Sequence, residues 1–286
     1  MKLSMRTMRA VVSVSLIVFA MPSFSNSTGT KQPSLQTSML TPMKSTRVAG
    51  YLSADALPNS LTLLPPPPAA GSPAFNADEQ AYRLTRSLRD TPRWTLASQD
   101  ADLQFPEAAG AFSCAVDAPI SEAQTPHLYM LLRRTLADGG FSVYAAKNHY
   151  RRDRPFVQFK ERSCVPQDES RLQKDGSYPS GHASVGWTWA LVLTELAPDR
   201  IDAVLQRGYA FGESRVICGV HWQSDVDASR VVAAGVVARL HADSKFAAEM
   251  RAAKAELAAV RAKHVTPTRD CAGERAALTI NEATNR

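Results

Sequence analysis

The stretch GSYPSGHASVGW, residues 176–187, stands directly before a run of apolar residues that ends near Leu196. Pro179 and Gly181 are turn-forming residues, and the following ASVGWTWALVLTEL predicts a buried helix. The first N–H groups of a helix have no partner within it, and the helix dipole favours negative charge there. The stretch therefore predicts a helix start that places His182 where phosphate binds readily. The alternative is an ordinary turn with a serine cap.

Helical patterns account for most of the chain beyond this stretch. One example follows Ser121, a candidate N-cap, and carries Leu128, Leu132 and Leu136 on one side before a glycine stop. No alternating strand pattern of useful length and no internal repeat is present. The sequence predicts an all-α fold, a single helical-bundle domain, with helices within 76–90, 91–103, 121–140, 141–154, 181–197, 197–215, 224–242 and 244–264.

Residues 1–25 have the order of a secretory signal peptide. Lys2, Arg6 and Arg9 precede any acidic residue, and the apolar run AVVSVSLIVFAM follows them. Small residues at Ser23 and Ser25 complete the pattern. The apolar run is short for a membrane anchor, which is the alternative, and no later segment has about 18 unbroken apolar residues. We predict cleavage near Ser25, a periplasmic or secreted location, and no membrane segment in the mature chain.

The rest of the chain divides by composition. Residues 26–62 are rich in Ser, Thr and Pro and predict a flexible N-terminal arm, and the proline run in 63–75 predicts a polyproline-like segment. The helical domain is expected over 63–264, with a C-terminal tail over 265–286. The formal net charge of +6 falls to +3 when the three leader cations are lost, so the chain is only modestly basic and is not expected to bind nucleic acid.

Four cysteines remain after the leader, at positions 114, 164, 218 and 271. They form no C-x-x-C pair, which argues against a zinc knuckle or a thioredoxin-like motif. Export makes disulfides plausible. Three pairings are open, and sequence spacing does not choose among them.

The residues that carry chemistry lie in three segments. In KNHYRRDRP, Lys147 and Arg154 are seven residues apart and share a helix face if the helix persists, with Arg151 between them. The second segment is PSGH. In SRVICGVHWQSD, Asp225 follows His221 by four residues, so a helix through both would let the carboxylate orient the imidazole.

Together the segments supply fixed cations, a helix N-terminus and two histidines. A tetrahedral dianion needs such a cage, because phosphoryl transfer spreads charge over three oxygens. Several alternatives are weaker. A metal trio of His221, Asp225 and Asp227 is disfavoured because metallophosphatase sites gather more His and Asp. A serine hydrolase lacks its G-x-S-x-G motif, and no P-loop motif is present.

The three segments together match a known signature. K-x6-R-P, P-S-G-H and S-R-x5-H-x3-D, in this order and spacing, resemble the acid phosphatase/vanadium haloperoxidase superfamily. The stretches LLPPPPAAGS, GSYPSGH and SRVICGVHWQSDVD resemble one branch of it, the secreted bacterial class A non-specific acid phosphatases. The likeness covers residues of about 60 to about 260. Ala183 departs from that branch, which often has Thr there, and lacks a possible hydroxyl near the phosphate.

The resemblance implies a role for each matching residue. His221 is implied as the nucleophile and Asp225 as the group that orients it. His182 is implied as the general acid for the leaving alkoxide and then as the base for water. The charged clamp would be Lys147, Arg154 and Arg215, with Ser180 and the Gly181 N–H as further oxyanion donors.

The resemblance also implies a helical, metal-free enzyme without cofactor that forms a homo-oligomer. The expected function is hydrolysis of a broad range of phosphate monoesters (nucleotides, sugar phosphates and aryl phosphates) through a phosphohistidine, with phosphotransfer as a further activity. The alternatives are a vanadate-dependent haloperoxidase, whose known members are much longer, and a phosphate-binding protein without turnover. Lipid-phosphate phosphatases share the signature but span membranes.

The resemblance bears on the cysteines too. Cys164 lies ten residues after Arg154, and Cys218 lies three after Arg215. Since both motifs must converge on one phosphate, we predict a Cys164–Cys218 disulfide, which leaves Cys114 and Cys271 to pair.

Overall fold

The computed structural model describes residues 48–284, so the predicted signal peptide and residues 26–47 of the predicted arm lie outside it. Within this range the chain forms helices and their connections, without a strand, which confirms the predicted all-α class. No helix in these residues combines the length and the apolar character that a membrane crossing requires.

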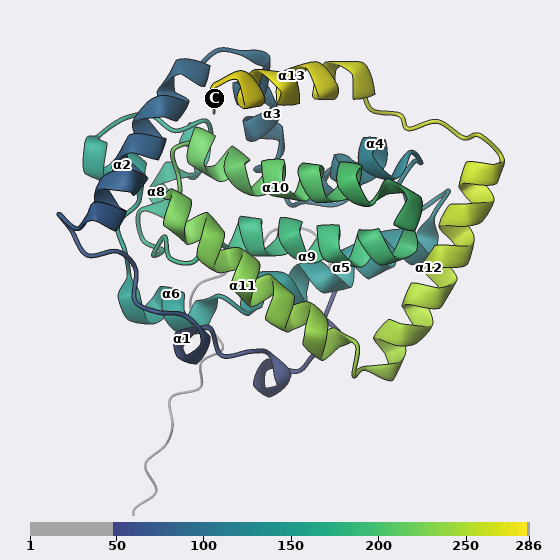
Figure 1. The fold of residues 1–286 in the computed structure, drawn as a ribbon. Helices are drawn as coiled ribbons and strands as arrows, with labels where there is room; N and C mark the ends of the chain where they lie inside the picture. The colour runs from purple at the N-terminus through teal and green to yellow at the C-terminus, as the bar shows by residue number, and fades with distance from the viewer. Residues whose placement is uncertain (1–47, 285–286) are drawn as a thin grey trace, which may run out of the picture. The chain divides into compact units, whose positions relative to one another are not determined.

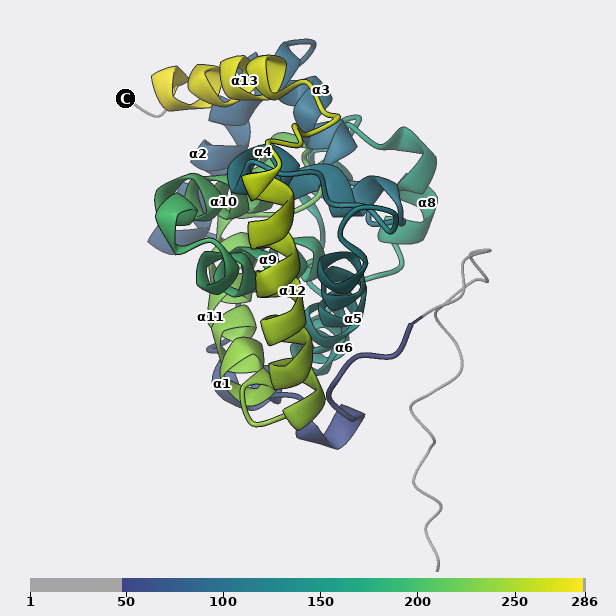
Figure 2. The ribbon, with the colours of Figure 1, turned by 90° about the vertical axis from the view of Figure 1, so that its right-hand side faces the viewer.

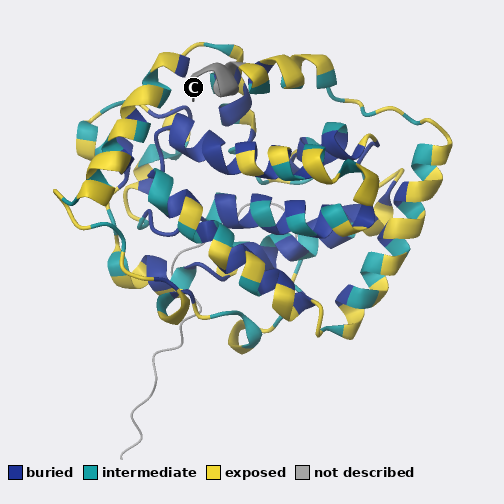
Figure 3. Ribbon diagram, viewed as in Figure 1, coloured by how far each residue is buried: buried dark blue, intermediate teal, exposed yellow. Residues whose placement is uncertain are grey.

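Helix α9 (Gly181–Leu196), which follows the PSGH turn, is the central element of this bundle (Figures 1 and 2). It packs against α5 (Pro126–Phe141), α10 (Ile201–Ile217) and α11 (Gln223–Leu240), while α12 (Ser244–Ala262) packs along α5. Both α9 and α10 are largely buried, as Figure 3 shows. The helix that begins at the predicted phosphate turn is therefore held on several sides.

Two glycines let α9 and α10 approach closely. A Cβ on Gly208 would lie 2.3 Å from the Ala190 side chain, and a Cβ on Gly186 would lie 2.3 Å from the Phe211 ring. Either contact is far below van der Waals distance, so a larger residue at either position would push the helices apart. The close packing fixes the start of α9 relative to the end of α10, where Arg215 lies.

Shorter helices surround these, and several have proline as their first residue, preceded by a residue that caps the helix. Ser72 and Thr91 each accept a hydrogen bond from a first-turn N–H. The first of these helices thus begins three residues before the expected Asn76, and α5 begins at Pro126 rather than after Ser121. The remaining α-helices are α1 (Ser60–Leu63), α2 (Pro73–Thr85), α3 (Pro92–Gln99), α4 (Ser113–Val116), α6 (Tyr144–Tyr150), α7 (Pro155–Phe159), α8 (Glu169–Leu172) and α13 (Cys271–Thr284).

The helix predicted across 141–154 is interrupted. α6 ends at Tyr150, Arg151 adopts a left-handed conformation with φ 45°, and Arg154 is extended with ψ 152° as the N-cap of α7. The residue before a proline is disfavoured in the helical region, and Arg154 precedes Pro155. The prediction that Lys147 and Arg154 share one helix face is therefore wrong, and Arg151 is exposed.

Residues outside the predicted domain limits of 63 and 264 also pack on these helices. The Tyr51 and Leu52 N–H groups donate to the Asp138 carboxylate at 3.0 Å each, and the Tyr51 ring lies 5.4 Å from that of Phe246. At the other end, α13 packs on α3. Residues 65–69, within the predicted polyproline segment, form no helix, and the Tyr178 hydroxyl donates to the Pro65 carbonyl.

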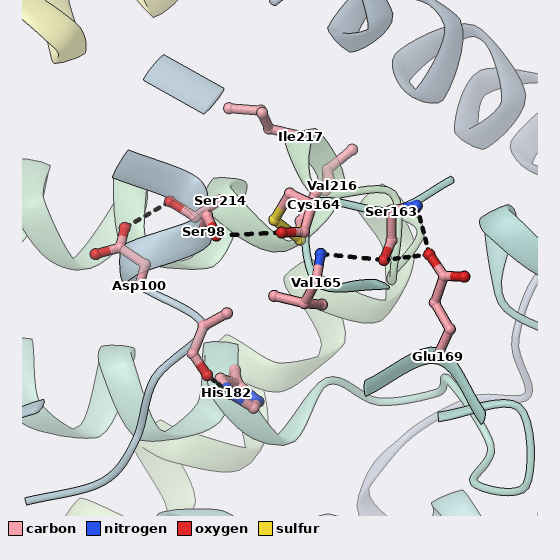
Figure 4. The surroundings of a disulfide bond; sticks show 12 residues. Ser98, Asp100, Ser163, Cys164, Val165, Glu169, His182, Ser214, Val216 and Ile217 are labelled. Carbon is pink, nitrogen blue, oxygen red and sulfur yellow. Dashed lines mark hydrogen bonds between the residues drawn. A yellow bond between two sulfur atoms is a disulfide. The ribbon is translucent and has the colours of Figure 1, made fainter. Parts of the chain in front are cut away.

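Both disulfides join the predicted partners, Cys114 with Cys271 and Cys164 with Cys218. The first attaches α13 to α4. The second joins the segment after α7 to the end of α10, and Ser98 donates a hydrogen bond of 3.1 Å to the Cys164 carbonyl beside it (Figure 4). The two predicted pairings are thus confirmed among the described residues.

Replacing both Cys114 and Cys271 with serine should lower the free energy of unfolding by about 2–4 kcal/mol, because a bridge that closes a long loop restricts the unfolded chain. Urea denaturation of oxidised wild type and variant measures the difference. Peptide mapping without reduction provides the control, since it must show the 114–271 and 164–218 linkages in the wild type. An unchanged urea midpoint in the variant would contradict this role of the bridge.

Candidate active site

Five of the eight predicted site residues line one cavity of about 140 Å³: Lys147, Arg154, Gly181, His182 and His221. The other three, Ser180, Arg215 and Asp225, do not line it and are buried. Apolar side chains form part of the wall, namely Leu103, Leu136, Val143, Leu172 and Val185. Segments far apart in the sequence therefore bring both histidines and two cations to one small space.

His221 lies between a carboxylate and a guanidinium. Its Nδ1 is 3.3 Å from Asp225 Oδ2, and its Nε2 is 3.0 Å from Arg154 Nη1. A guanidinium only donates, so we assign a lone pair to Nε2 and the ring proton to Nδ1. This tautomer leaves Nε2 as the nucleophilic nitrogen. Burial and the charge of Arg154 hold the pKa of His221 well below its usual range.

One helix through both His221 and Asp225 was considered from the sequence spacing. That helix does not form, and the two side chains meet in another way. α11 begins at Gln223, and Trp222 is extended with ψ 160°. Asp225 is the third residue of the helix, and its carboxylate turns back to accept the Trp222 N–H at 2.8 Å. The same oxygen faces His221, so a helix-capping interaction places the carboxylate on the histidine.

His182 is the second residue of α9 and has a backbone partner. Its Nε2 lies 2.9 Å from the Ala101 carbonyl oxygen, which only accepts. We therefore assign the ring proton of the neutral form to Nε2, which leaves Nδ1 able to exchange a proton with a ligand. Burial and the charge of Arg215 hold the pKa of His182 well below its usual range.

Backbone carbonyls hold two of the cations. Arg154 Nε donates to the Leu172 and Asp175 carbonyl oxygens at 2.9 and 3.0 Å, and Lys147 Nζ donates to that of Gly176 at 2.6 Å. The Asp175 carboxylate lies 3.3 Å from Arg154 Nη2 and 3.8 Å from Lys147 Nζ. Burial, reinforced by the charge of Arg154, lowers the pKa of Lys147 to about 7.

Arg215 has donors without partners. Within the described part of the chain, nothing accepts a hydrogen bond from its buried Nε or Nη1, and burial lowers its pKa to about 9. An unpaired buried donor on a charged group is costly. A bound oxyanion would satisfy these donors, so the arginine fits the predicted clamp.

Of the two predicted oxyanion donors in the PSGH turn, Gly181 lines the cavity and Ser180 does not. The Ser180 hydroxyl oxygen accepts the Ala183 N–H at 3.3 Å as the N-cap of α9, and the Ser180 N–H donates to the Asp225 carbonyl at 3.1 Å. The serine thus connects the PSGH turn to α11, and its role as an oxyanion donor stays a prediction.

Sequence reasoning missed several residues at the site. Asp175 contacts two clamp residues, and Ala101 holds His182. Arg152 binds Asp225 Oδ1 at 2.7 Å, and Arg171 lines the cavity. The only local signal was proximity in sequence, since Asp175 directly precedes GSYPSGH and Arg152 lies inside the first motif.

The metal trio considered above is not assembled. Asp227 pairs with Arg230 at 2.5 Å and is exposed. Among residues 48–279, no group of three or more His, Cys, Asp or Glu side chains is placed to hold a metal ion.

The sequence is similar to known phosphatases over most of its length. The profile of the PAP2 superfamily matches residues 127–247, which include all three motifs. A non-specific acid phosphatase of Providencia stuartii is 46% identical over 212 residues, which are 74% of this chain and 86% of the relative. The chain belongs to the class A non-specific acid phosphatases of the PAP2 superfamily.

Two further relatives have similar sequence identity to this chain. An acid phosphatase of Zymomonas mobilis is 44% identical over 207 residues, which are 72% of this chain and 78% of the relative. A non-specific acid phosphatase of Salmonella typhimurium is 43% identical over 220 residues, which are 73% of this chain and 88% of the relative. The matched length shows that the likeness extends well beyond the three motifs of the PAP2 superfamily.

The pKa of Lys147 makes anion affinity depend on pH. Sulfate remains a dianion above pH 5 and should bind the protonated lysine, so loss of the lysine proton should lower its affinity by up to about tenfold per pH unit above pH 7. Isothermal titration calorimetry with sulfate between pH 6 and pH 8.5 measures this. In Lys147→Met the affinity should be lower at pH 6 and change less with pH. An equal pH dependence in both proteins would contradict the assignment.

Proposed function

We propose that this protein hydrolyses a broad range of phosphate monoesters in the cavity, through a phosphorylated His221, after export to the periplasm or the medium. The observation that carries the proposal is the state of His221. Its Nδ1 faces Asp225, its Nε2, which we assign a lone pair, lies beside Arg154, and the histidine lines the cavity together with Lys147 and Arg154. Family membership supports the same reaction.

In the first step, His221 Nε2 attacks phosphorus, a P–N bond forms and the ester P–O bond breaks. The leaving alkoxide takes a proton from His182. Lys147, Arg154 and Arg215 stabilise the charge on the three equatorial oxygens, with the N–H groups at the start of α9. Arg154 Nη1 must shift from His221 Nε2 to a phosphate oxygen, and Asp225 stabilises the imidazolium that forms.

In the second step, water attacks phosphorus on the face that the alkoxide left. His182, now neutral, accepts the proton of the water, the P–N bond breaks and inorganic phosphate is released. An alcohol in place of water would give phosphotransfer by the same route. This step needs no metal ion, and independence of metal and cofactor stays a prediction.

Binding of substrate lets His182 take up from solvent the proton that the first step needs. Burial and Arg215 hold the pKa of His182 low in the free site. A dianion bound beside it opposes the charge of Arg215 and raises that pKa, so His182 is protonated when the substrate is bound. Activity should thus fail in acid, where His221 Nε2 is protonated, and in alkali, where His182 is neutral, with each limb reporting coupled groups.

The surroundings support broad specificity. The cavity is lined by charged groups that would bind the phosphoryl group and by Leu103, Val143 and Val185, which would offer only apolar contact to the rest of the substrate. Nucleotides, sugar phosphates and aryl phosphates are therefore the proposed substrates. Two disulfides are in keeping with an oxidising compartment. The homo-oligomer rests on the family resemblance alone.

The leaving group should separate the two histidines. Nitrophenolate needs little protonation and a sugar alkoxide needs much, so His182→Ala should lose more first-step rate on a sugar phosphate than on nitrophenyl phosphate, by a factor of about 10²–10⁴. His221→Ala should lose both activities. Rapid-quench kinetics with both substrates measure the first-step rate of each variant. The wild-type protein must hydrolyse both substrates. Equal losses in His182→Ala, or an active His221→Ala protein, would contradict the roles.

A further inference from the structure

Arg152 lies between two buried carboxylates, those of Asp225 and Asp78. Its Nη1 donates to Asp225 Oδ1 at 2.7 Å and to Ser224 Oγ at 2.8 Å, and its Nη2 donates to Asp78 Oδ2 at 2.7 Å. The Arg152 side chain is 8% exposed, and those of Asp78 and Asp225 are 3% and 0% exposed. The planar fork of an arginine reaches all three acceptors, which the single ammonium of a lysine does not match.

Asp78 belongs to α2 but binds the start of α11. It accepts the Ser224 N–H at 2.8 Å and the Ser224 hydroxyl at 2.6 Å. The N-terminal end of α11 is thus capped by Asp225, which belongs to the same helix, and by Asp78, which belongs to α2. Arg152 lies between the two carboxylates. Aromatic rings cover this arginine, whose guanidinium carbon lies 5.2 Å from the Trp222 ring centre and 5.7 Å from that of Phe75.

Asp225 must be ionised and correctly oriented to serve His221. Burial raises the pKa of Asp225, and the charge of Arg152 is the largest opposing influence. The two carboxylate oxygens have separate partners, since Oδ1 binds Arg152, whereas Oδ2 accepts the Trp222 N–H and faces His221. A cation on Oδ1 therefore keeps the carboxylate charged and directs Oδ2 to the histidine.

We propose that Arg152, itself fixed by Asp78, is a positioning residue that holds Asp225 ionised and aimed at His221 and so sets the reactivity of the nucleophile. The proposal rests on the proposed function. Arg152 does not line the cavity, and its side chain donates hydrogen bonds to Asp225, Ser224 and Asp78. It should therefore affect the rate of phosphoryl transfer far more than the binding of substrate.

The pH profile distinguishes this role from a merely structural one. The charged and titratable groups that face Asp225 or His221 come from several segments: Asp78 of α2, Lys147 of α6, Arg152 and Arg154 of the following loop, His182 of α9 and Arg215 of α10. Loss of the Arg152 charge raises the pKa of Asp225. Activity needs Asp225 ionised, so this change moves the acid limb to higher pH.

The test compares kcat and KM for nitrophenyl phosphate from pH 4 to pH 9 in four variants: Arg152→Gln, Arg152→Lys, Asp78→Asn and the control Arg151→Gln. Arg151 is the adjacent arginine, is exposed and does not line the cavity. Urea denaturation of each variant gives the folded fraction, and kcat is expressed per folded molecule.

Arg152→Gln should lower kcat by about 10- to 100-fold, the usual effect of losing a charge-assisted hydrogen bond, and should change KM by less than about threefold. Its acid limb should move to higher pH. Arg152→Lys keeps the charge but not the fork, so kcat should fall less and the acid limb should stay. Asp78→Asn should lower kcat without moving the acid limb up, and Arg151→Gln should match wild type.

A folded Arg152→Gln protein with wild-type kcat and acid limb would overturn the proposal, as would a loss of activity that only follows the folded fraction. If the glutamine variant does not fold, Arg152→Lys decides: a lower kcat at unchanged KM supports the role, and an unchanged kcat overturns it. Wild type without hydrolysis would refute the proposed function itself. Active wild type with unaffected Arg152 variants would refute only the positioning role.

Discussion

Positive charge buried without matching internal negative charge is the constraint on which this structure depends. Lys147, Arg154 and Arg215 are each at least 97% buried, and the partly exposed Asp175 carboxylate pairs only with the first two. The consequences are the lowered pKa of Lys147 and the unpaired donors of Arg215. A bound dianion removes both costs at once, so the cage favours phosphate and, more strongly, a transition state with charge on three oxygens.

The fold holds this cage with neutral groups. Backbone carbonyls of Leu172, Asp175, Gly176 and Val220 orient Arg154 or Lys147 without cancelling their charge. The Cys164–Cys218 disulfide and the close packing of α9 on α10 fix the segments that carry these groups. Asp175 is the carboxylate that lines the cavity, whereas Asp225 lies at His221 Nδ1, where it stabilises the imidazolium rather than competes with phosphate.

The sequence predicted what local patterns and motif spacing can encode. α9 begins at the PSGH turn as expected, five of the eight predicted site residues line the cavity, and the disulfides join the predicted cysteines. The interruption at Arg151 was missed because Pro155 was expected to end the helix at Arg154. The helix ends four residues earlier, at Tyr150. Contacts between distant segments have no local pattern in the sequence, and the hydrogen bond from Ser224 to Asp78 spans 146 residues. Helix α13 lies in residues that had been predicted as a C-terminal tail.

The central claim is that His221 takes the phosphoryl group, and labelling tests it most directly. Wild-type protein is mixed with a ³²P-labelled monoester, quenched in alkali within the first turnover, digested and mapped by peptide. The account predicts an acid-labile, alkali-stable label on the peptide that contains His221, and none in His221→Ala. A label on a serine, on an aspartate or on His182, or hydrolysis at full rate without any labelled enzyme, would contradict it.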